Sequence, residues 1–259
     1  MKIKKILVTQ QQSEAEKSPF VELAEKNKIQ VDFKPFVRVE GISAKEFRLS
    51  KIDLSTYTAV IFTSKTAVDH LFRICEEVRY CMPETMKYFC LTEAIAYYLQ
   101  KYVVYRKRKI FYGKSCIADL KDSLLKNKNE KFLLPLSDTH KEDIPEALRA
   151  MGLNFTKAIL YRTVSTNLKE CCPDVTAYDM MVFYSPACVK SLLENFPRFK
   201  QNHIKIASFG QSTAKAINEA GLRLDIEAPT PQAPSMTMAI ELFLKEQAKS
   251  NGNGKPKKK

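Results

Sequence analysis

Two similar segments, far apart in the chain, constrain the fold more than any other feature of the sequence. Each has a short apolar strand, a serine and then a helix with apolar residues on one face; the segments are Ala59-Val-Ile-Phe-Thr-Ser64 and Met181-Val-Phe-Tyr-Ser-Pro186 with their following helices. The apolar helix positions keep one register, because 68, 71, 72 and 75 correspond to 189, 192, 193 and 196. Two halves with the same order of elements indicate an internal duplication.

The residues that end these strands predict helix N-termini able to bind anions. Ser185 is a good N-cap, and Pro186 suits the first helical position because its missing N–H would have no partner there. A second apolar strand, 204–209, leads into the turn Gly210-Gln211-Ser212-Thr213, whose counterpart in the first half starts at Thr92. Free N–H groups and the helix dipole favour a carboxylate at such turns.

The order of elements predicts parallel sheets covered by helices on both faces. Strands expected from the pattern include Lys4 to Thr9, Tyr57 to Thr63 and Tyr102 to Phe111, and Ser13 to Lys26 is expected to be the first helix. Ligands of such sheets bind beyond the carboxyl ends of the strands. This rule selects the turns at Thr63-Ser64, Thr92, Ser185 and 210–213 as the candidate site.

Composition sets the class of protein. The chain has 259 residues, a formal net charge of +13 and 45% hydrophobic residues, which is typical of a globular protein with room for two domains. Four lysines belong to the Gly/Asn/Lys segment at the C-terminus, which has nothing to bury. With no apolar run long enough to span a bilayer and no signal-peptide core after Met1, we expect a cytoplasmic protein without a membrane partner.

Several kinds of chemistry lack sequence support. The chain has only seven glycines and neither a Walker A nor a G-x-G-x-x-G sequence. The three histidines, His70, His140 and His203, are dispersed, and no two of the seven cysteines form a C-x-x-C pair. We therefore expect no metal and no cofactor, and reduced cysteines that pack as small apolar side chains.

Further motifs add a family resemblance. Besides the two serine turns, the chain contains Leu160-Tyr161-Arg162-Thr163-Val164, Ala207-Ser-Phe-Gly-Gln-Ser-Thr213-Ala214 and Gly221 before a Pro-rich loop. Together and in this order, from the first strand to about residue 246, they resemble the uroporphyrinogen-III synthase family. Each motif alone is weak.

The resemblance implies a particular α/β architecture. It implies two flavodoxin-like parallel-sheet domains from the duplication, joined by a two-stranded linker, with the active site in the interdomain cleft. On this sequence the domains would be 1–36 plus 165–246, and 40–161, with a disordered basic tail at 247–259. Phe36 to Val39 and Tyr161 to Val164 would be the linker strands.

The resemblance also implies a reaction, the closure of hydroxymethylbilane to uroporphyrinogen III with inversion of ring D and loss of water. Tyr161 would be catalytic, as hydrogen-bond donor to the leaving hydroxyl; the alternative is an ordinary strand tyrosine. The substrate-binding residues would be those of the four turns: Thr63, Ser64, Thr92, Ser185, Pro186, Gly210, Gln211, Ser212 and Thr213. For Ser185 and Thr213 the alternative is pure helix capping. We expect a monomer in transient contact with hydroxymethylbilane synthase.

Two other functions stay open from the sequence alone. Ile95 and Gln10 depart from the family's pattern, so a non-catalytic two-lobed ligand-binding or regulatory relative is the first alternative. The second is a nucleic-acid-binding protein that uses the basic tail and the basic-aromatic run from Tyr102 to Tyr112. Nucleic acid is not the expected partner, because the aromatic residues of that run are more simply core and edge residues of a strand.

Overall fold

The structure, a computed structural model, describes residues 3–12 and 19–252, with side chains as far as residue 248. The chain divides into two compact units. Unit 1 comprises residues 1–38 and 164–259, and unit 2 comprises 39–163. The chain therefore passes between the units twice, once within strand β3 (Val37–Gly41) and once within β8 (Phe155–Ser165).

Unit 1 is built on a five-stranded sheet of order β11-β10-β9-β1-β2, with every neighbouring pair parallel. Its strands are β1 (Lys5–Val8), β2 (Gln30–Phe33), β9 (Met180–Phe183), β10 (Lys205–Phe209) and β11 (Ile226–Ala228). Its helices are α1 (Pro19–Asn27), α7 (Leu168–Cys171), α8 (Pro186–Asn195), α9 (Gln211–Glu219) and α10 (Met236–Gly252), with a 3₁₀ turn η3 at Val175–Ala177.

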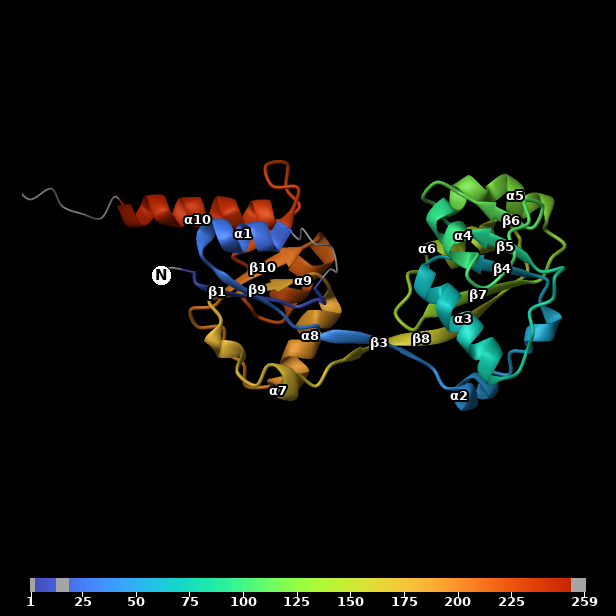
Figure 1. Ribbon diagram of the computed structural model, residues 1–259, viewed down its shortest axis with the longest axis horizontal. Helices are drawn as coiled ribbons and strands as arrows, with labels where there is room; N and C mark the ends of the chain where they lie inside the picture. The colour runs from blue at the N-terminus through green and yellow to red at the C-terminus, as the bar shows by residue number, and fades with distance from the viewer. Residues whose placement is uncertain (1–2, 13–18, 253–259) are drawn as a thin grey trace, which may run out of the picture. The chain divides into compact units, whose positions relative to one another are not determined.

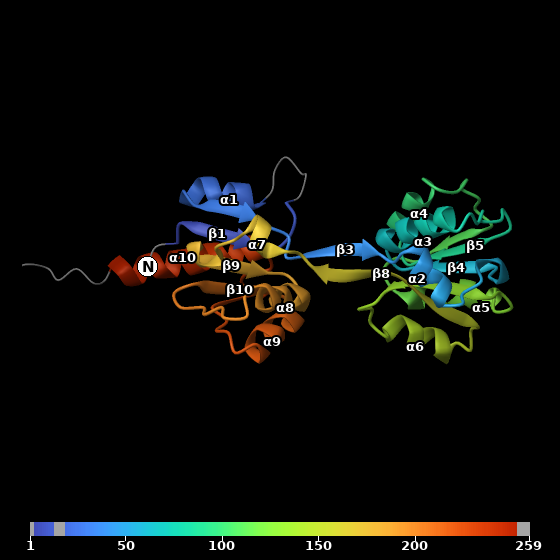
Figure 2. The ribbon, with the colours of Figure 1, turned by 90° about the horizontal axis from the view of Figure 1, so that it is seen from below.

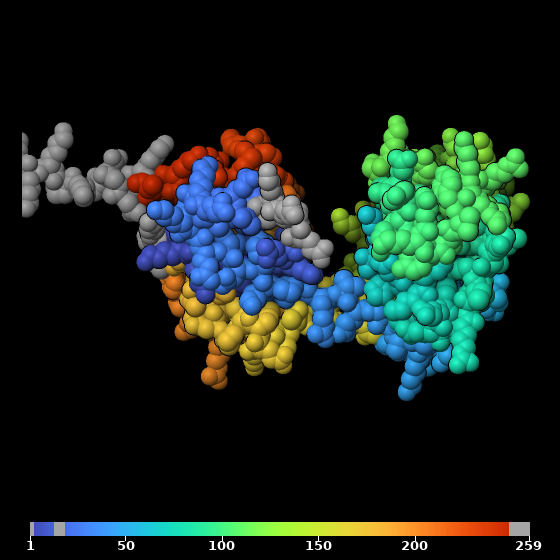
Figure 3. All heavy atoms as spheres, in the orientation of Figure 1, coloured from blue at the N-terminus to red at the C-terminus, as the bar shows by residue number. Residues whose placement is uncertain are grey.

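Successive side chains of the unit 1 strands point to opposite faces of the sheet and pack in two separate hydrophobic cores. Ile6 and Val8 pack with α1 and α10 on one face, whereas Leu7 packs with α8 and α9 on the other. Figure 1 shows α1 and α10 side by side over the sheet, and Figure 2 shows α8 next to α9. In the space-filling view the blue atoms of α1 meet the red atoms of α10 (Figure 3). Helices on both faces explain why these strands read as continuous apolar runs.

Unit 2 contains a six-stranded sheet of order β3-β8-β7-β4-β5-β6, parallel from β8 to β6. The strands besides β3 and β8 are β4 (Ala59–Phe62), β5 (Lys87–Cys90), β6 (Ile110–Tyr112) and β7 (Phe132–Ser137). Its helices are α2 (Ala44–Leu49), α3 (Lys65–Glu77), α4 (Glu93–Leu99), α5 (Lys121–Lys126) and α6 (Asp143–Ala150), with 3₁₀ turns η1 (Leu54–Thr56) and η2 (Ile117–Leu120).

The unit 2 sheet is also covered on both faces. Val60 and Phe62 of β4 join a core with α2, α3 and α4, while Ala59 and Ile61 face the core made with α5 and α6. This strand is fully buried, as the run Ala-Val-Ile-Phe predicts.

The two units share one arrangement of strands. Unit 1 has the order β2-β1-β9-β10-β11, and β8-β7-β4-β5-β6 is the same arrangement in unit 2, with β7 and β8 in the places of β1 and β2. Numbered along the chain, the unit 1 order is 2-1-3-4-5, the flavodoxin-like one, whereas in unit 2 the last two strands of the chain take the first two places. The predicted α/β class with parallel sheets is confirmed, whereas the common origin of the halves stays a prediction.

Three local predictions need comment. The strand expected over Tyr102 to Phe111 is wrong except for its end, because β6 has only Ile110–Tyr112. Tyr102 instead stacks on Phe72 of α3 at 4.5 Å and donates to Asp69 at 2.6 Å. The tail expected from residue 247 is helical as far as Gly252, because α10 continues through good helix formers such as Gln247 and Ala248. Residues 13–18 of the first predicted helix, and 253–259, lie outside the described residues.

Candidate active site

Two capped helices begin at the carboxyl ends of neighbouring strands in unit 2. Ser64, after β4, is the N-cap of α3, and its hydroxyl accepts the N–H of Ala67 at 3.0 Å. Thr92, after β5, is the N-cap of α4, and its hydroxyl accepts the N–H of Ile95 at 3.4 Å. Capping side chains fix the helix starts, so the remaining first-turn N–H groups of both helices are directed beyond the same sheet edge.

Tyr161 of β8 reaches this edge. Its hydroxyl oxygen lies 3.3 Å from the Ser64 hydroxyl oxygen, a distance at which either group can donate. Tyr161 pairs in the sheet with Ser137, the last residue of β7, and both residues are half-buried. Thr63, half-buried and next to Ser64, belongs to the same edge. Unit 2 therefore brings together a tyrosine and a serine hydroxyl beside a helix N-terminus.

An imidazole that sequence reasoning missed lies against Tyr161. The His70 ring stacks on the Tyr161 ring, with centroids 5.0 Å apart and an angle of 17° between the planes. Burial lowers the pKa of His70, the charge of Arg73 lowers it further, and Asp69 opposes both. No motif identifies His70, because the contact joins a helix to a strand that is distant in the sequence.

Charged residues near Tyr161 are held by partners in unit 2. The Arg162 side chain forms an ion pair with Glu46 of α2, which lowers the pKa of Glu46 and raises that of Arg162. The carboxylate of Asp138 accepts the N–H of Thr163 at 3.2 Å, and the N–H of Asp138 donates to the Tyr161 carbonyl at 3.0 Å. These contacts fix the backbone at the tyrosine carbonyl and just after it.

Unit 1 has two comparable turns. Ser185 is the N-cap of α8 and accepts the N–H of Cys188 at 3.3 Å, and its hydroxyl lies 3.2 Å from the buried Cys188 sulfur. Pro186 is exposed at the first helical position. The local sequence therefore specifies this helix start as predicted, and Pro186 removes an N–H that would otherwise lack a partner.

The second turn of unit 1 depends on a glycine. Gly210 is the N-cap of α9 with φ +90° and ψ 145°, and its N–H donates to the Ala228 carbonyl at 2.6 Å. Gln211 and Ser212 are exposed at the start of α9, whereas Thr213 is buried, with 1% of its surface exposed. The accessible groups of this turn are therefore Gln211, Ser212 and their backbone N–H groups.

A pocket of about 320 Å³ opens beside these turns of unit 1. Tyr184 and Phe209, which immediately precede Ser185 and Gly210, line it with Gln10 and Phe33. The Tyr184 and Phe209 rings are 5.7 Å apart and tilted by 34°, and burial raises the pKa of Tyr184 to about 12. The carboxyl edge of the unit 1 sheet thus combines an apolar aromatic wall with helix N-termini.

The comparison with known families decides the identity. Residues 18–238 match the family model described as uroporphyrinogen-III synthase HemD. The chain belongs to the uroporphyrinogen-III synthase family. A uroporphyrinogen-III synthase of Saccharomyces cerevisiae is 25% identical over 139 residues, which cover 49% of this chain and 50% of the yeast protein. The matched region thus spans about half the length of that relative.

Solved structures of uroporphyrinogen-III synthases have the same fold. The Helicobacter pylori protein aligns with a TM-score of 0.56 and 18% identity, over 94% of this chain and all of that one. A mutant of the Thermus thermophilus protein aligns with a TM-score of 0.51 and 16% identity, over 95% of this chain and 99% of that one. The fold resemblance extends through both units.

The predicted site residues of this uroporphyrinogen-III synthase family member form two sets. Thr63, Ser64, Thr92 and Tyr161 lie in unit 2, whereas Ser185, Pro186 and residues 210–213 lie in unit 1. Within each unit the residues lie at the carboxyl ends of the strands, where a parallel sheet binds its ligands. The interdomain cleft stays a prediction.

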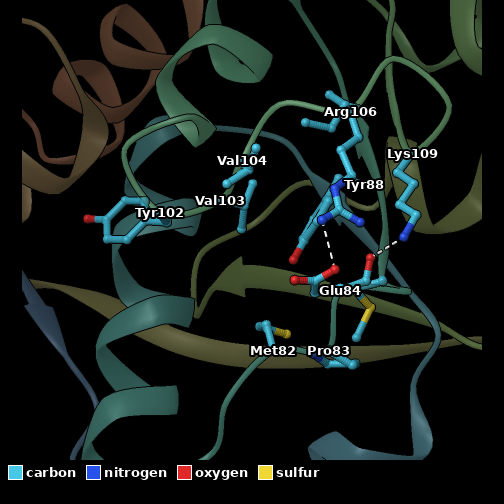
Figure 4. A pocket seen from close by; sticks show the side chains of 11 residues that line it. Met82, Pro83, Glu84, Tyr88, Tyr102, Val103, Val104, Arg106 and Lys109 are labelled. Carbon is cyan, nitrogen blue, oxygen red and sulfur yellow. Dashed lines mark hydrogen bonds and ion pairs between the residues drawn. The ribbon is translucent and has the colours of Figure 1, made fainter.

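Unit 2 also has a pocket, which lies before the starts of β5 and β6, at the edge of the sheet opposite to the capped helix starts. Figure 4 shows the side chains that line it. Its volume is about 160 Å³, and Arg106 pairs with Glu84 across it at 2.7 Å. Lys109 donates to the Glu84 carbonyl (Figure 4). A pocket of this size is below the usual range for a drug-sized ligand, about 300 to 1,000 Å³, so it is not a candidate for tetrapyrrole binding.

The described part of the chain has neither a metal-binding cluster nor a membrane-spanning helix. Among residues 3–12 and 19–252, no group of three or more His, Cys, Asp or Glu side chains could hold a metal ion. Over the same residues, no helix has both the length and the apolar character needed to cross a membrane.

Proposed function

We propose that this chain is a cyclising lyase that converts hydroxymethylbilane to uroporphyrinogen III, with inversion of ring D and loss of water. The observation that supports this most directly is the Tyr161 hydroxyl beside Ser64 at the carboxyl edge of the unit 2 sheet. Membership of the uroporphyrinogen-III synthase family supports the reaction class.

The proposed role of Tyr161 is hydrogen-bond donation to the hydroxyl that leaves. When the C–O bond of the hydroxymethyl group breaks, the oxygen takes a proton and departs as water, and the electron pair of the pyrrole stabilises the azafulvene cation. The substituted carbon of ring D then attacks, and the spiro intermediate fragments and recloses at the free α-carbon of ring D. That carbon loses its proton, which balances the proton that left with the water. A donor at the departing oxygen lowers the barrier of the first step. Ser64 orients that donor.

Substrate positioning is the second part of the proposal. Hydroxymethylbilane is a flexible octacarboxylate, and its closure by the spiro route requires one conformation out of many. The capped helix starts at Ser64, Thr92, Ser185 and Gly210 offer backbone N–H groups and positive dipole ends to carboxylates. The positive charge of the chain attracts a polyanion over a longer range. We propose that these turns bind the substrate's side-chain carboxylates.

We also propose that the protein acts as a monomer in the cytoplasm and meets hydroxymethylbilane synthase transiently. A short-lived, self-cyclising substrate favours a cyclase that captures it soon after release. Sedimentation of the protein alone, and of its mixture with that synthase, tests both statements.

The test of function is an isomer assay. Hydroxymethylbilane is generated in place by its own synthase, and the oxidised products are separated by chromatography. Uroporphyrin III above the spontaneous type I product supports the proposal. Type I alone, from protein with a cooperative thermal transition, contradicts it and favours the non-catalytic ligand-binding relative. A heat-unfolded sample serves as the control for spontaneous closure.

A further inference from the structure

We infer that His70 is a positioning residue for Tyr161, which holds the phenol ring so that its hydroxyl stays beside Ser64. The inference rests on the proposed function, because it assigns His70 a role in the reaction through Tyr161.

Helix α3 supplies two contacts of the Tyr161 side chain, one to its hydroxyl and one to its ring. Its N-cap Ser64 meets the hydroxyl at 3.3 Å, and His70, less than two turns into the helix, stacks on the ring at 5.0 Å. A near-parallel aromatic contact restricts the tilt of the ring, and the hydroxyl contact restricts its direction. Together the two contacts define where the phenolic oxygen lies.

The imidazole is itself held in place. Nε of Arg73 donates to Nδ1 of His70 at 3.3 Å, and the same guanidinium donates to the Ile42 carbonyl at 2.7 Å. Arg73 also forms an ion pair with Glu77, whose carboxylate accepts the N–H of Ala44 at 3.1 Å. The ring is therefore anchored through Arg73 to the segment that starts α2. It does not depend on the tyrosine for its orientation.

The protonation state of His70 suits this role. An imidazole that accepts a hydrogen bond at Nδ1 carries its proton on Nε2 and is neutral. Burial and the charge of Arg73 favour this neutral form by lowering the pKa, and Asp69 is the opposing charge. A neutral ring adds no positive charge to the face of the phenol, so the contact between the two rings is an uncharged stack.

The experiment compares two substitutions of His70. His70→Phe keeps an aromatic ring for the stack, whereas His70→Ala removes it. We expect His70→Ala to lower kcat by about tenfold to a hundredfold, the effect of a small misplacement of a reacting group, with KM little changed, and His70→Phe to retain most of the activity. Phe111→Ala is the matched control, because it removes a similar stack in unit 2, with Phe89 at 4.8 Å and 17°, and should leave kcat unchanged.

A second background separates positioning from a general structural effect. In Tyr161→Phe protein, His70→Ala should lower kcat no further, because no hydroxyl remains to be positioned. An equal loss in both backgrounds overturns the inference, as does full activity of His70→Ala in the parent protein. All variants are first checked for a cooperative thermal transition.

A measurement that does not need turnover distinguishes a failure of the His70 positioning role from a failure of the proposed Tyr161 donor role. NMR of protein with isotope-labelled tyrosine gives the ring resonance of Tyr161, which Tyr161→Phe identifies by its loss. We expect His70→Ala to shift this resonance and His70→Phe to leave it still ring-shifted. An unchanged resonance in His70→Ala overturns the positioning role. Unchanged turnover of Tyr161→Phe instead contradicts the proposed donor role, whatever the resonance does.

Discussion

The hydroxyl of Tyr161 lies 3.3 Å from the hydroxyl of Ser64, although 97 residues separate the two in the sequence. The sheet order brings them together, because β8, which carries Tyr161, is separated from β4 only by β7. Ser64 follows β4 directly and accepts an N–H of α3, so its oxygen is fixed before any ligand binds. A donor held at this distance is preorganised, and preorganised groups need no rearrangement in the transition state.

The first prediction concerns this hydroxyl. Tyr161→Phe should lower kcat by about a hundredfold, in the range of a lost general-acid contribution, with little change in KM. The isomer assay measures it. Tyr178→Phe is the matched control, because it removes a tyrosine hydroxyl that donates to Asp32 at 2.8 Å in unit 1 and is not one of the proposed site residues. Equal kcat in Tyr161→Phe and the parent protein would exclude Tyr161 as the donor.

The second prediction separates capping from substrate binding. Ser64→Ala should destabilise the protein by about 1 kcal/mol, the usual cost of a lost N-cap, and should also lower turnover, because Ser64 orients Tyr161. Asp53→Ala removes the N-cap of η1, whose carboxylate accepts the N–H of Ser55 at 2.9 Å, so it should cost similar stability and leave turnover unchanged. Chemical denaturation and the isomer assay give the two quantities. The same turnover in both variants would mean that Ser64 is only a cap.

The third prediction tests the turn at Gly210. No atom lies within 4 Å of the place where an added Cβ would be, so the cost of Gly210→Ala comes from the backbone at φ +90°, about 1 to 3 kcal/mol. Gly221→Ala, at φ +70° with the same free space, is the control for this strain. We expect both to lower the melting temperature and only Gly210→Ala to raise KM. If the two variants have equal KM values, the turn does not bind substrate.

The fourth prediction is a pH dependence of stability. The Asp119 carboxylate accepts the N–H groups of Ser115 at 2.9 Å, Cys116 at 3.1 Å and Lys114 at 2.9 Å, which lower its pKa from 3.8 to about 2. The folded protein therefore binds fewer protons at this group than the unfolded chain does. The stabilisation is complete above the unfolded value of 3.8 and is lost as the pH falls through about 2.

Asp119→Asn tests that dependence. The free energy of unfolding of the parent protein should exceed that of the variant at pH 5, and the difference should shrink as the pH falls toward 2. Urea denaturation at several pH values measures it. Comparison of the two proteins is needed because Glu142, bound by Lys157, Arg149 and His140, also has its pKa lowered to about 2. A difference that stays constant from pH 5 to 2 would contradict the assignment.

The sequence correctly predicted the structural features that depend on residues close together in the chain. Ser64, Thr92 and Ser185 cap helices as expected, because a hydroxyl reaches an N–H only three residues ahead and this geometry needs no distant partner. The parallel sheets followed from apolar runs that alternate with amphipathic helices. The same local reasoning failed at Tyr102, where contacts with Phe72 and Asp69 of another helix outweighed a strand-like pattern.

The sequence by itself thus determined the α/β class, the helix starts and the turns that carry the candidate site. These features depend on short-range hydrogen bonds and on apolar periodicity, and both are set by residues that are close together in the chain. Only the tertiary structure decided that His70 lies on Tyr161, that Thr213 is buried below its turn and that Arg73 holds the imidazole. These contacts depend on how the helices pack on the sheet and which strands become neighbours, and many residues distant in the chain jointly fix that packing.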